Sequence, residues 1–347
     1  MIEGHGNNIY NTNHKVIADF SSNVATCLPH QLLLDHLAGR LKTIANYPEP
    51  HARQLCEKLA QKHGVNPSQV LVANGSTEAF YLIASVFRGK QSLVFTPSFA
   101  EYEDACLMHR HYLSFLPVDQ FSQPFNQVPD LVWLGNPNNP DGTVTPINQI
   151  KEKLLKYPKT TFVIDEAYSG LCADFESIAE HLTDFKNLIV TNSLTKMFSI
   201  PGLRLGYLLA PKLVVEKLQQ FLMPWSVNTL AIEAGKFIID HEQELMPDVP
   251  AILKRSQELQ AMLGQSELLD VVPSLCNYFL VKLKRGNAAS LKEYLLKEHG
   301  FLIRDASNFR GLDDRYFRIA VQDETANFKL YKAIIHWLQS ENNERVV

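Results

Sequence analysis

The sequence predicts an α/β fold: a large domain with a mostly parallel sheet, followed by a small α+β domain at the C-terminus. Six short, continuous apolar runs alternate with segments of helical spacing between residues 70 and 215, as expected for strands buried on both faces of a parallel sheet. After Pro211 the composition changes, and long helical patterns precede a denser mixture of strands and helices. We expect an N-terminal arm at residues 1–30, a large domain at 31–225 and a small C-terminal domain at 226–347.

The segment before the sheet is predicted to contain an irregular arm and two helices. The first 30 residues are polar and broken, which suggests a segment that lies against another part of the protein. Helical spacing covers residues 32–43, and Pro48 and Pro50 then interrupt it, because proline disfavours helix at and before its own position. A second helix covers about residues 52–63 and ends at Gly64 as its C-cap.

Apolar runs and helical spacing also predict the strands of the sheet and the elements after it. Predicted strands of the sheet are residues 70–73, 93–96, 131–134, 162–164, 188–190 and 206–209, with helices at 77–88 and 147–156. Later helices are expected at 214–222, 230–263 (interrupted near Pro247 and Pro250), 288–299 and 325–339, and later strands at 277–283, 301–304 and 316–321. Ligand sites in parallel sheets lie in the loops at the carboxyl ends of the strands, so those loops are where functional residues are expected.

Composition favours an ordinary globular protein of the cytoplasm. Hydrophobic residues make up 46% of the 347 residues and charged residues 20%, and the net charge of −4 gives no basic field for nucleic acid. The N-terminus has no signal-peptide pattern, and no apolar run is long enough to span a membrane. Five cysteines without a CxxC pair suggest reduced thiols. They are Cys27, Cys56, Cys106, Cys172 and Cys276.

The polar loop at residues 192–207, between two apolar runs, carries the main chemical signal. Lys196 lies there with hydroxyls at Ser193 and Thr195 and with a second cation at Arg204. A lysine that is partly desolvated beside another cation has its ammonium form disfavoured, which suits it to attack a carbonyl carbon. The alternative is a surface lysine in a polar loop.

Two loops after earlier strands carry groups suited to a phosphate and to a flat ring. Ser76 and Thr77 follow Gly75 at the start of a helix, where free N–H groups and hydroxyls would hold a phosphate. A plain N-cap is the alternative. Phe99 follows the second strand and could either stack on a heterocycle or belong to the core.

Polar residues also end the third and fourth apolar runs. Two Asn-Pro steps at residues 136–140 make a rigid turn, in which the Asn139 amide can hydrogen-bond a phenolic oxygen. Asp165 ends a buried strand, where a carboxylate is costly unless it pairs with a cation such as a protonated ring nitrogen. Tyr168, three residues later, could reach the same ligand. A nucleotide-binding Asp-Glu pair is the alternative for Asp165, but no matching phosphate loop accompanies it.

These motifs, in this order, resemble those of pyridoxal-phosphate enzymes of the aspartate-aminotransferase fold type, and the resemblance covers nearly the whole chain. It implies an aspartate-aminotransferase-like large domain that binds pyridoxal 5'-phosphate, no metal, and catalytic roles for Lys196, Asp165 and Tyr168. Tyr47 matches a tyrosine that reaches the neighbouring subunit's cofactor, which implies a homodimer with shared active sites. Cofactor binding is implied for Gly75, Ser76, Thr77, Phe99, Asn139, Asp165, Tyr168, Ser193, Thr195, Lys196, Arg204 and Tyr47.

Two arginines in the small domain suggest the class of substrate. Strand alternation at residues 316–321 puts Phe317 and Ile319 on one face and Arg318 on the other, aimed at the cleft. Arg304 emerges from the preceding predicted strand. Two arginines that converge on a cleft suit a substrate with two anionic ends, such as a carboxylate and a phosphate. Solvated surface cations are the alternative.

Several segments resemble in sequence the threonine-phosphate decarboxylases of cobalamin synthesis. They are residues 97–102, 193–207, 223–228, 277–280 and 302–321. Histidinol-phosphate aminotransferases share the cofactor set but match residues 223–228 and 310–318 less well. The first resemblance implies decarboxylation of O-phospho-L-threonine to aminopropanol phosphate, and the alternative is aminotransfer from histidinol phosphate to 2-oxoglutarate. Tyr168 favours the aminotransferases, because the decarboxylases carry phenylalanine at this position. The decarboxylase resemblance implies substrate-binding roles for His5, Asn23, Arg304 and Arg318.

Functions of other classes lack support in the sequence. Ligand-sensing domains of transcription regulators share this fold type, but they carry an added basic helix-turn-helix segment for which this chain has neither length nor charge. A non-catalytic nucleotide-binding module is disfavoured because its glycine-rich signatures are missing. We therefore expect an enzyme that acts on a small phosphorylated amino-acid substrate.

Overall fold

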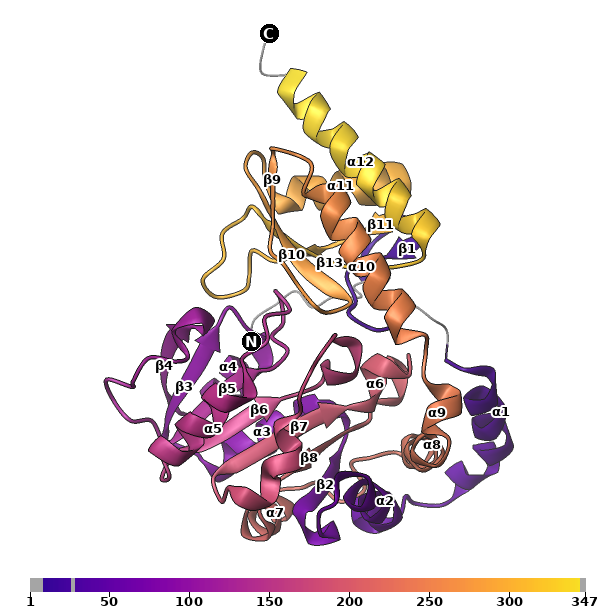
Figure 1. Ribbon diagram of the computed structural model, residues 1–347. Helices are drawn as coiled ribbons and strands as arrows, with labels where there is room; N and C mark the ends of the chain where they lie inside the picture. The colour runs from indigo at the N-terminus through magenta and orange to yellow at the C-terminus, as the bar shows by residue number, and fades with distance from the viewer. Residues whose placement is uncertain (1–8, 26–28, 344–347) are drawn as a thin grey trace.

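The computed structural model describes residues 9–25 and 29–343, which form two stacked parts (Figure 1). A seven-stranded sheet with its helices forms the lower part in this view, and a four-stranded sheet with three helices forms the upper part. We call them the large domain and the small domain. Loops at the carboxyl ends of the large-domain strands meet strands and a loop of the small domain between the two sheets. A site there can therefore take residues from both domains.

The sheet of the large domain is mostly parallel, as predicted. Its strand order is β2-β8-β7-β6-β5-β3-β4, and β8 alone runs antiparallel to its neighbours β2 and β7 among these strands. Strands β2, β5 and β8 are buried along their whole length, which explains their continuous apolar runs. The strands are β2 (Val70–Ala73), β3 (Gln91–Thr96), β4 (Tyr112–Pro117), β5 (Leu131–Gly135), β6 (Thr161–Asp165), β7 (Leu188–Ser193) and β8 (Gly206–Leu209).

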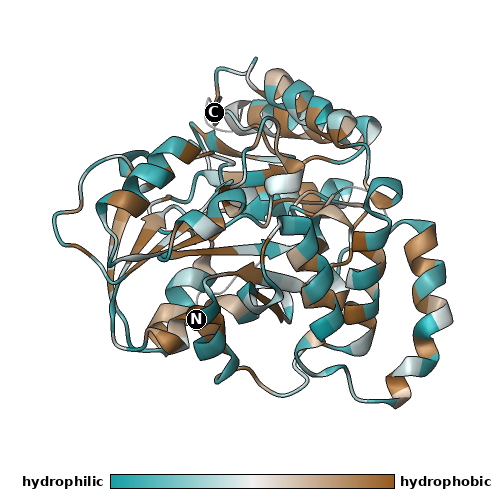
Figure 2. Cartoon of the chain, turned by 60° about the horizontal axis from the view of Figure 1, so that its bottom comes forward, coloured by the Kyte–Doolittle hydropathy of each residue, from teal (hydrophilic) through white to brown (hydrophobic). Residues whose placement is uncertain are grey.

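Strand β4 and helix α4 (Ala100–Met108) of the large domain were not predicted. Strand β4 lies at the edge of the sheet and is half-exposed, so it has no continuous apolar run. Helix α4 buries Glu103 and Asp104 along with its apolar residues, which hides its helical periodicity. The helices around this sheet are α1 (Gln31–Arg40), α2 (Arg53–His63), α3 (Gly75–Val86), α4, α5 (Ile147–Lys156), α6 (Leu194–Met197) and α7 (Lys212–Gln219). In Figure 2 the helices alternate hydrophobic and hydrophilic segments, as amphipathic helices packed on a sheet do.

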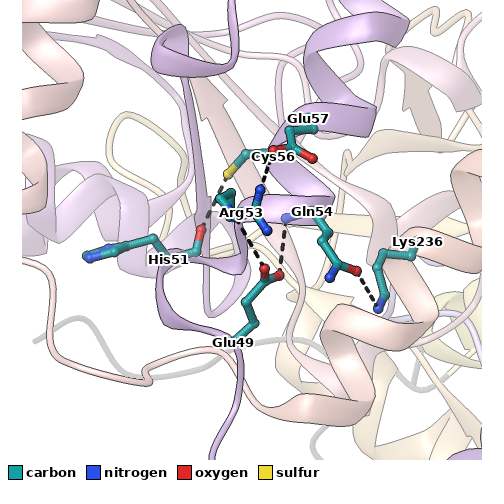
Figure 3. A network of polar contacts seen from close by, with 7 residues as sticks. All are labelled: Glu49, His51, Arg53, Gln54, Cys56, Glu57 and Lys236. Carbon is teal, nitrogen blue, oxygen red and sulfur yellow. Dashed lines mark hydrogen bonds and ion pairs between the residues drawn. The ribbon is translucent and has the colours of Figure 1, made fainter.

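Helices α8 (Thr229–Asp240) and α9 (Glu242–Leu245) pack with the large domain. Helix α8 contacts α1 and α2, and its buried residues belong to the same apolar core as those two helices. Lys236 of α8 also donates a hydrogen bond to Gln54 of α2 over 3.3 Å (Figure 3). The sequence places the domain boundary at residue 226. This packing favours a later boundary, and we propose one near Met246.

The small domain is built on an antiparallel sheet of order β12-β13-β10-β9. Phe317 and Ile319 of β13 face its core, whereas Arg318 faces the large domain, as strand alternation predicts. The N-terminal arm joins this domain, because β1 (Ala18–Asp19) pairs in parallel with β11 (Phe301–Leu302). The other elements are α10 (Val249–Leu263), β9 (Leu269–Val271), β10 (Tyr278–Leu283), α11 (Ala288–His299), β12 (Arg304–Asp305), β13 (Tyr316–Ala320) and α12 (Glu324–Asn343).

Candidate active site

Two adjoining cavities lie where the large domain meets the small domain. The inner cavity, of about 70 Å³, is lined by loops at the carboxyl ends of the large-domain strands. The outer cavity, of about 400 Å³, is lined by both domains and by the N-terminal arm. Several side chains line both, so the two spaces form one cleft. These shared residues are Thr77, Phe99, Asn139, Tyr168, Lys196 and Arg204.

One end of the inner cavity gathers hydrogen-bond donors suited to an anion. Gly75 has a φ of +77° and begins α3, and a side chain there would meet the Arg204 guanidinium, with Cβ only 2.6 Å from Nη2. Glycine at this position therefore lets the guanidinium lie directly against the start of the helix. The Ser193 and Thr195 hydroxyls lie 2.7 Å apart on the same wall. A helix N-terminus, two hydroxyls and a guanidinium are groups suited to bind a phosphate.

The other end of the inner cavity holds a buried carboxylate. Asp165 accepts hydrogen bonds from the Tyr102 hydroxyl at 2.6 Å, from the Thr191 hydroxyl at 3.1 Å and from the Ala167 N–H at 3.2 Å. Burial raises the pKa of Asp165, and these donors together with the charge of Lys196 oppose that rise. A carboxylate so placed favours a cationic partner within the cavity, such as a protonated ring nitrogen.

The predicted lysine and aromatic residues line the same cavity. Lys196 belongs to the short helix α6, which Ser193 caps by accepting from the Thr195 N–H at 3.3 Å. Its Nζ lies 5.7 Å from the centroid of the Tyr168 ring. Phe99 precedes α4 and makes an edge contact with Tyr102, with ring centroids 6.0 Å apart. A flat ring in this space would therefore have an amine and an aromatic side chain as neighbours.

The inner cavity fits the predicted cofactor. Its anion-binding end suits the phosphate of pyridoxal phosphate, its carboxylate suits the ring nitrogen, and its lysine lines the same cavity. Tyr102 and Thr191 were missed by the sequence analysis. Tyr102 lies three residues after Phe99 on a helical segment, a spacing that could have identified it. The predicted residues that line the inner cavity are Gly75, Ser76, Thr77, Phe99, Asn139, Asp165, Tyr168, Ser193, Thr195, Lys196 and Arg204.

The outer cavity brings together the two predicted arginines. Arg304 and Arg318 are cross-strand partners on β12 and β13, and they are 9% and 5% exposed. Arg304 donates to the side-chain amide oxygen of Asn308 over 2.7 Å, and burial and the charge of Arg318 lower the pKa of Arg304 to about 10. Arg318 donates to Asn139 and to the Ser21 carbonyl oxygen. Two buried like charges side by side favour an anionic ligand between the domains.

Unpaired polar groups accompany these cations. Asn23 is 2% exposed, lines the outer cavity, and has no hydrogen-bond partner among residues 9–25 and 29–343 at either side-chain polar atom. The Nε of Arg318 is also buried and unpaired. Buried polar groups without partners cost about 1–3 kcal/mol each, so a ligand that pairs with them gains affinity. Ser22, Glu101 and Asn308 also line this cavity, and the sequence analysis did not single them out.

One predicted site residue of the described chain lies outside the cleft. Tyr47 is 80% exposed, stacks on Trp225 with ring centroids 4.7 Å apart, and lines neither cavity. His5 lies outside the described residues. The structure therefore brings together the predicted residues of the large domain with Asn23, Arg304 and Arg318, but it does not place Tyr47 in the cleft of its own chain.

Comparisons with known proteins agree with this arrangement. The profile of the family described as aminotransferase class I and II matches residues 8–334. The chain is 30% identical to the threonine-phosphate decarboxylase of Salmonella typhimurium over 92% of this chain and 90% of that protein. It is 28% identical to the histidinol-phosphate aminotransferase of Caldicellulosiruptor saccharolyticus over 92% and 91%. The crystal structure of L-threonine-O-3-phosphate decarboxylase from Porphyromonas gingivalis superposes with a TM-score of 0.90 at 40% identity, covering 93% of this chain and all of that one.

Proposed function

This chain belongs to the aminotransferase class I and II family, and we propose that it decarboxylates O-phospho-L-threonine to aminopropanol phosphate. As a member of this family, it is a pyridoxal-phosphate-dependent enzyme. The alternative is aminotransfer from histidinol phosphate to 2-oxoglutarate, because aminotransferases of that name are similar over as much of the chain. The 40% identity to a decarboxylase of known structure supports the first activity.

The observation that carries the proposal is the pair of buried arginines beside Lys196. Phosphothreonine has a phosphate and a carboxylate, one anion for each of Arg304 and Arg318. Histidinol phosphate has no carboxylate and would leave one buried guanidinium without an opposite charge, at a cost of about 2–5 kcal/mol. Tyr168 favours the alternative, because a tyrosine at this position resembles the aminotransferases and not the decarboxylases.

The residues of the cleft have separable roles in this reaction. Pyridoxal phosphate supplies an electron sink for the electron pair released at the substrate α-carbon. Arg304 and Arg318 bind the two anionic groups and so set which bond of the α-carbon faces the sink. Decarboxylation breaks the bond from the α-carbon to the carboxylate, and Lys196 Nζ is placed to deliver the proton that replaces it. In the aminotransfer alternative, Lys196 instead removes the α-proton.

We also propose a homodimer in which Tyr47 serves the partner subunit's site. Tyr47 is exposed, and hydrogen bonds hold the segment that follows it (Figure 3). The Glu49 carboxylate accepts from the Gln54 N–H over 3.1 Å, and the Cys56 thiol donates to the His51 carbonyl oxygen over 3.4 Å. A fixed, exposed aromatic residue suits a contact with a second chain. The ring against which it stacks, that of Trp225, is also exposed.

The location we propose is the cytoplasm. The cysteines in the described part of the chain, Cys56, Cys106, Cys172 and Cys276, are free thiols, as in proteins of reducing compartments. Across residues 9–25 and 29–343, no helix has the length and apolarity needed to cross a membrane.

Product analysis tests the proposed activity. Holoenzyme is incubated separately with O-phospho-L-threonine and with histidinol phosphate, each with and without 2-oxoglutarate, and carbon dioxide and glutamate are measured. We expect carbon dioxide from phosphothreonine, independent of 2-oxoglutarate. Glutamate from histidinol phosphate with no carbon dioxide from phosphothreonine would assign the chain to the aminotransferases.

A further inference from the structure

An ion pair joins the two domains at the wall of the outer cavity. Arg310, in the loop between β12 and β13, donates to both carboxylate oxygens of Glu103, over 2.9 Å from Nε and 2.6 Å from Nη2. Glu103 lies on α4 of the large domain and is 9% exposed. The guanidinium also lies over the Phe115 ring of β4, 4.0 Å from its centroid. A planar guanidinium held by two hydrogen bonds and an aromatic face has a defined orientation.

Both partners of this ion pair lie next to residues that line the outer cavity. On the large-domain side, Ala100 and Glu101 precede Glu103 on α4 and line the cavity. On the small-domain side, Asn308 and Phe309 precede Arg310 and line it as well. The ion pair therefore connects two walls of the same cavity at one point.

The loop that Arg310 anchors also orients Arg304. Asn308 accepts a hydrogen bond from Arg304 over 2.7 Å, and the Phe309 ring centroid lies 5.3 Å from the Arg304 guanidinium carbon. Phe309 is 7% exposed and packs with Leu280 and Ala306 of the small domain. Asn308 and Phe309 thus hold the Arg304 side chain toward the cavity. If the loop moved at Arg310, these two residues would move with it.

We propose that Arg310 is a positioning residue, which through Glu103 holds the loop of residues 306–315 so that Arg304 can bind the anionic group of the substrate. The inference rests on the proposed function, because it assigns Arg304 to an anion. It differs from a general contribution to stability, because loss of the ion pair is expected to weaken substrate binding more than it slows turnover. The bidentate contact also predicts that Arg310→Lys restores binding only in part, since an ammonium cannot make the same fork.

The test measures binding of inorganic phosphate to the holoenzyme by calorimetry, with KM and kcat for O-phospho-L-threonine measured in parallel. The variants are Glu103→Gln, Arg310→Met, Arg310→Lys and the double variant Glu103→Gln/Arg310→Met, with thermal unfolding as a check on folding. Asp313→Asn is the matched control, because it removes an exposed ion pair with Arg315 from the same loop. Arg304→Met reports on the anion site itself.

We expect each of Glu103→Gln and Arg310→Met to weaken phosphate binding and raise KM by about tenfold, with kcat changed less than about threefold. The double variant should be no weaker than the single variants, because one interaction has been lost in all three. The Asp313→Asn control should stay within about twofold of the wild type.

Three outcomes would overturn the inference. Wild-type phosphate binding in Glu103→Gln and Arg310→Met, while Arg304→Met binds weakly, would remove the positioning role and leave the proposed function intact. Losses that add in the double variant would show that the two residues act separately. Unchanged phosphate binding together with an unchanged KM for O-phospho-L-threonine in Arg304→Met would overturn the anion site, and with it both the inference and the substrate part of the proposed function.

Discussion

The inner and outer cavities of the cleft are built in different ways. All residues that line the inner cavity belong to the large domain and lie near the ends of its strands. The outer cavity shares some of these residues and takes its other walls from the N-terminal arm, from α4 and from the small domain. Their charges also differ, since the inner cavity buries the Asp165 carboxyl group, whose pKa is raised, and the outer cavity buries Arg304, whose pKa is lowered.

This difference suggests that the inner cavity serves the chemical step and the outer cavity serves the choice of substrate. The inner cavity can bind the cofactor with residues of one domain, whereas the outer cavity exists only when the two domains and the arm lie together. Substitutions in the inner cavity should therefore lower turnover, and substitutions in the outer cavity should raise KM. The following predictions test that division, from the largest expected effect to the smallest.

Replacement of Lys196 by alanine should have the largest effect. The purified protein should be yellow, and Lys196→Ala should lose the visible band and at least roughly 10⁴-fold in turnover, because the reactive amine is gone. Absorbance spectra with added pyridoxal phosphate provide the measurement. Retention of the band by the variant would exclude Lys196 from the cofactor attachment.

Asp165→Asn should fold and should lower turnover by about a hundredfold, because the charge that holds a proton on the ring nitrogen is lost. Steady-state kinetics and the affinity for pyridoxal phosphate measure the effect. Glu166→Gln is the matched control, because Glu166 instead accepts from Ser177 and from the Ile178 N–H outside the cleft. Equal losses in both variants would show that the effect of Asp165 is not specific.

Arg304→Met should raise KM for the phosphorylated substrate by about thirtyfold, with a smaller change in kcat, because a buried charge contact to the substrate is lost. Arg315→Met is a suitable control, since Arg315 pairs with Asp313 at the surface. A fall in kcat at unchanged KM would place Arg304 with the inner-cavity residues and would contradict the division.

Tyr47→Ala should lower activity by about tenfold through loss of one hydrogen bond to the partner's site. Co-expression of Tyr47→Ala and Lys196→Ala chains should restore about a quarter of the wild-type sites, because half of the random dimers are mixed and each has one complete site. Light scattering checks the dimer. A fully active monomer would refute the shared site.

The smallest predicted effect concerns stability and pH. Burial raises the pKa of Glu166 to about 7, from 4.5 in the unfolded chain. The folded state therefore binds the extra proton between these values, and the free energy of unfolding should fall by up to ~3 kcal/mol as pH rises from about 4.5 to 7. Glu166→Gln should flatten that slope in denaturant titrations. An equally steep slope in the variant would assign the pH dependence to other groups.

The same division explains what could be predicted from the sequence. Inner-cavity residues such as Asp165 and Lys196 follow buried strands directly, so local patterns placed them in the correct loops. Tyr102 was missed because its helix buries acidic residues and shows no clear periodicity. The Arg310–Glu103 ion pair joins residues 207 positions apart, and no local pattern relates them. Contacts between domains depend on tertiary packing, which periodicity does not describe.

The most direct test of the account is a competition between the two substrates in one tube. Holoenzyme receives equal concentrations of O-phospho-L-threonine and histidinol phosphate with excess 2-oxoglutarate, and initial rates of carbon dioxide and glutamate formation are compared. Their ratio equals the ratio of kcat/KM values for the two reactions. The account predicts at least about tenfold more carbon dioxide than glutamate. Glutamate formed without carbon dioxide would contradict it.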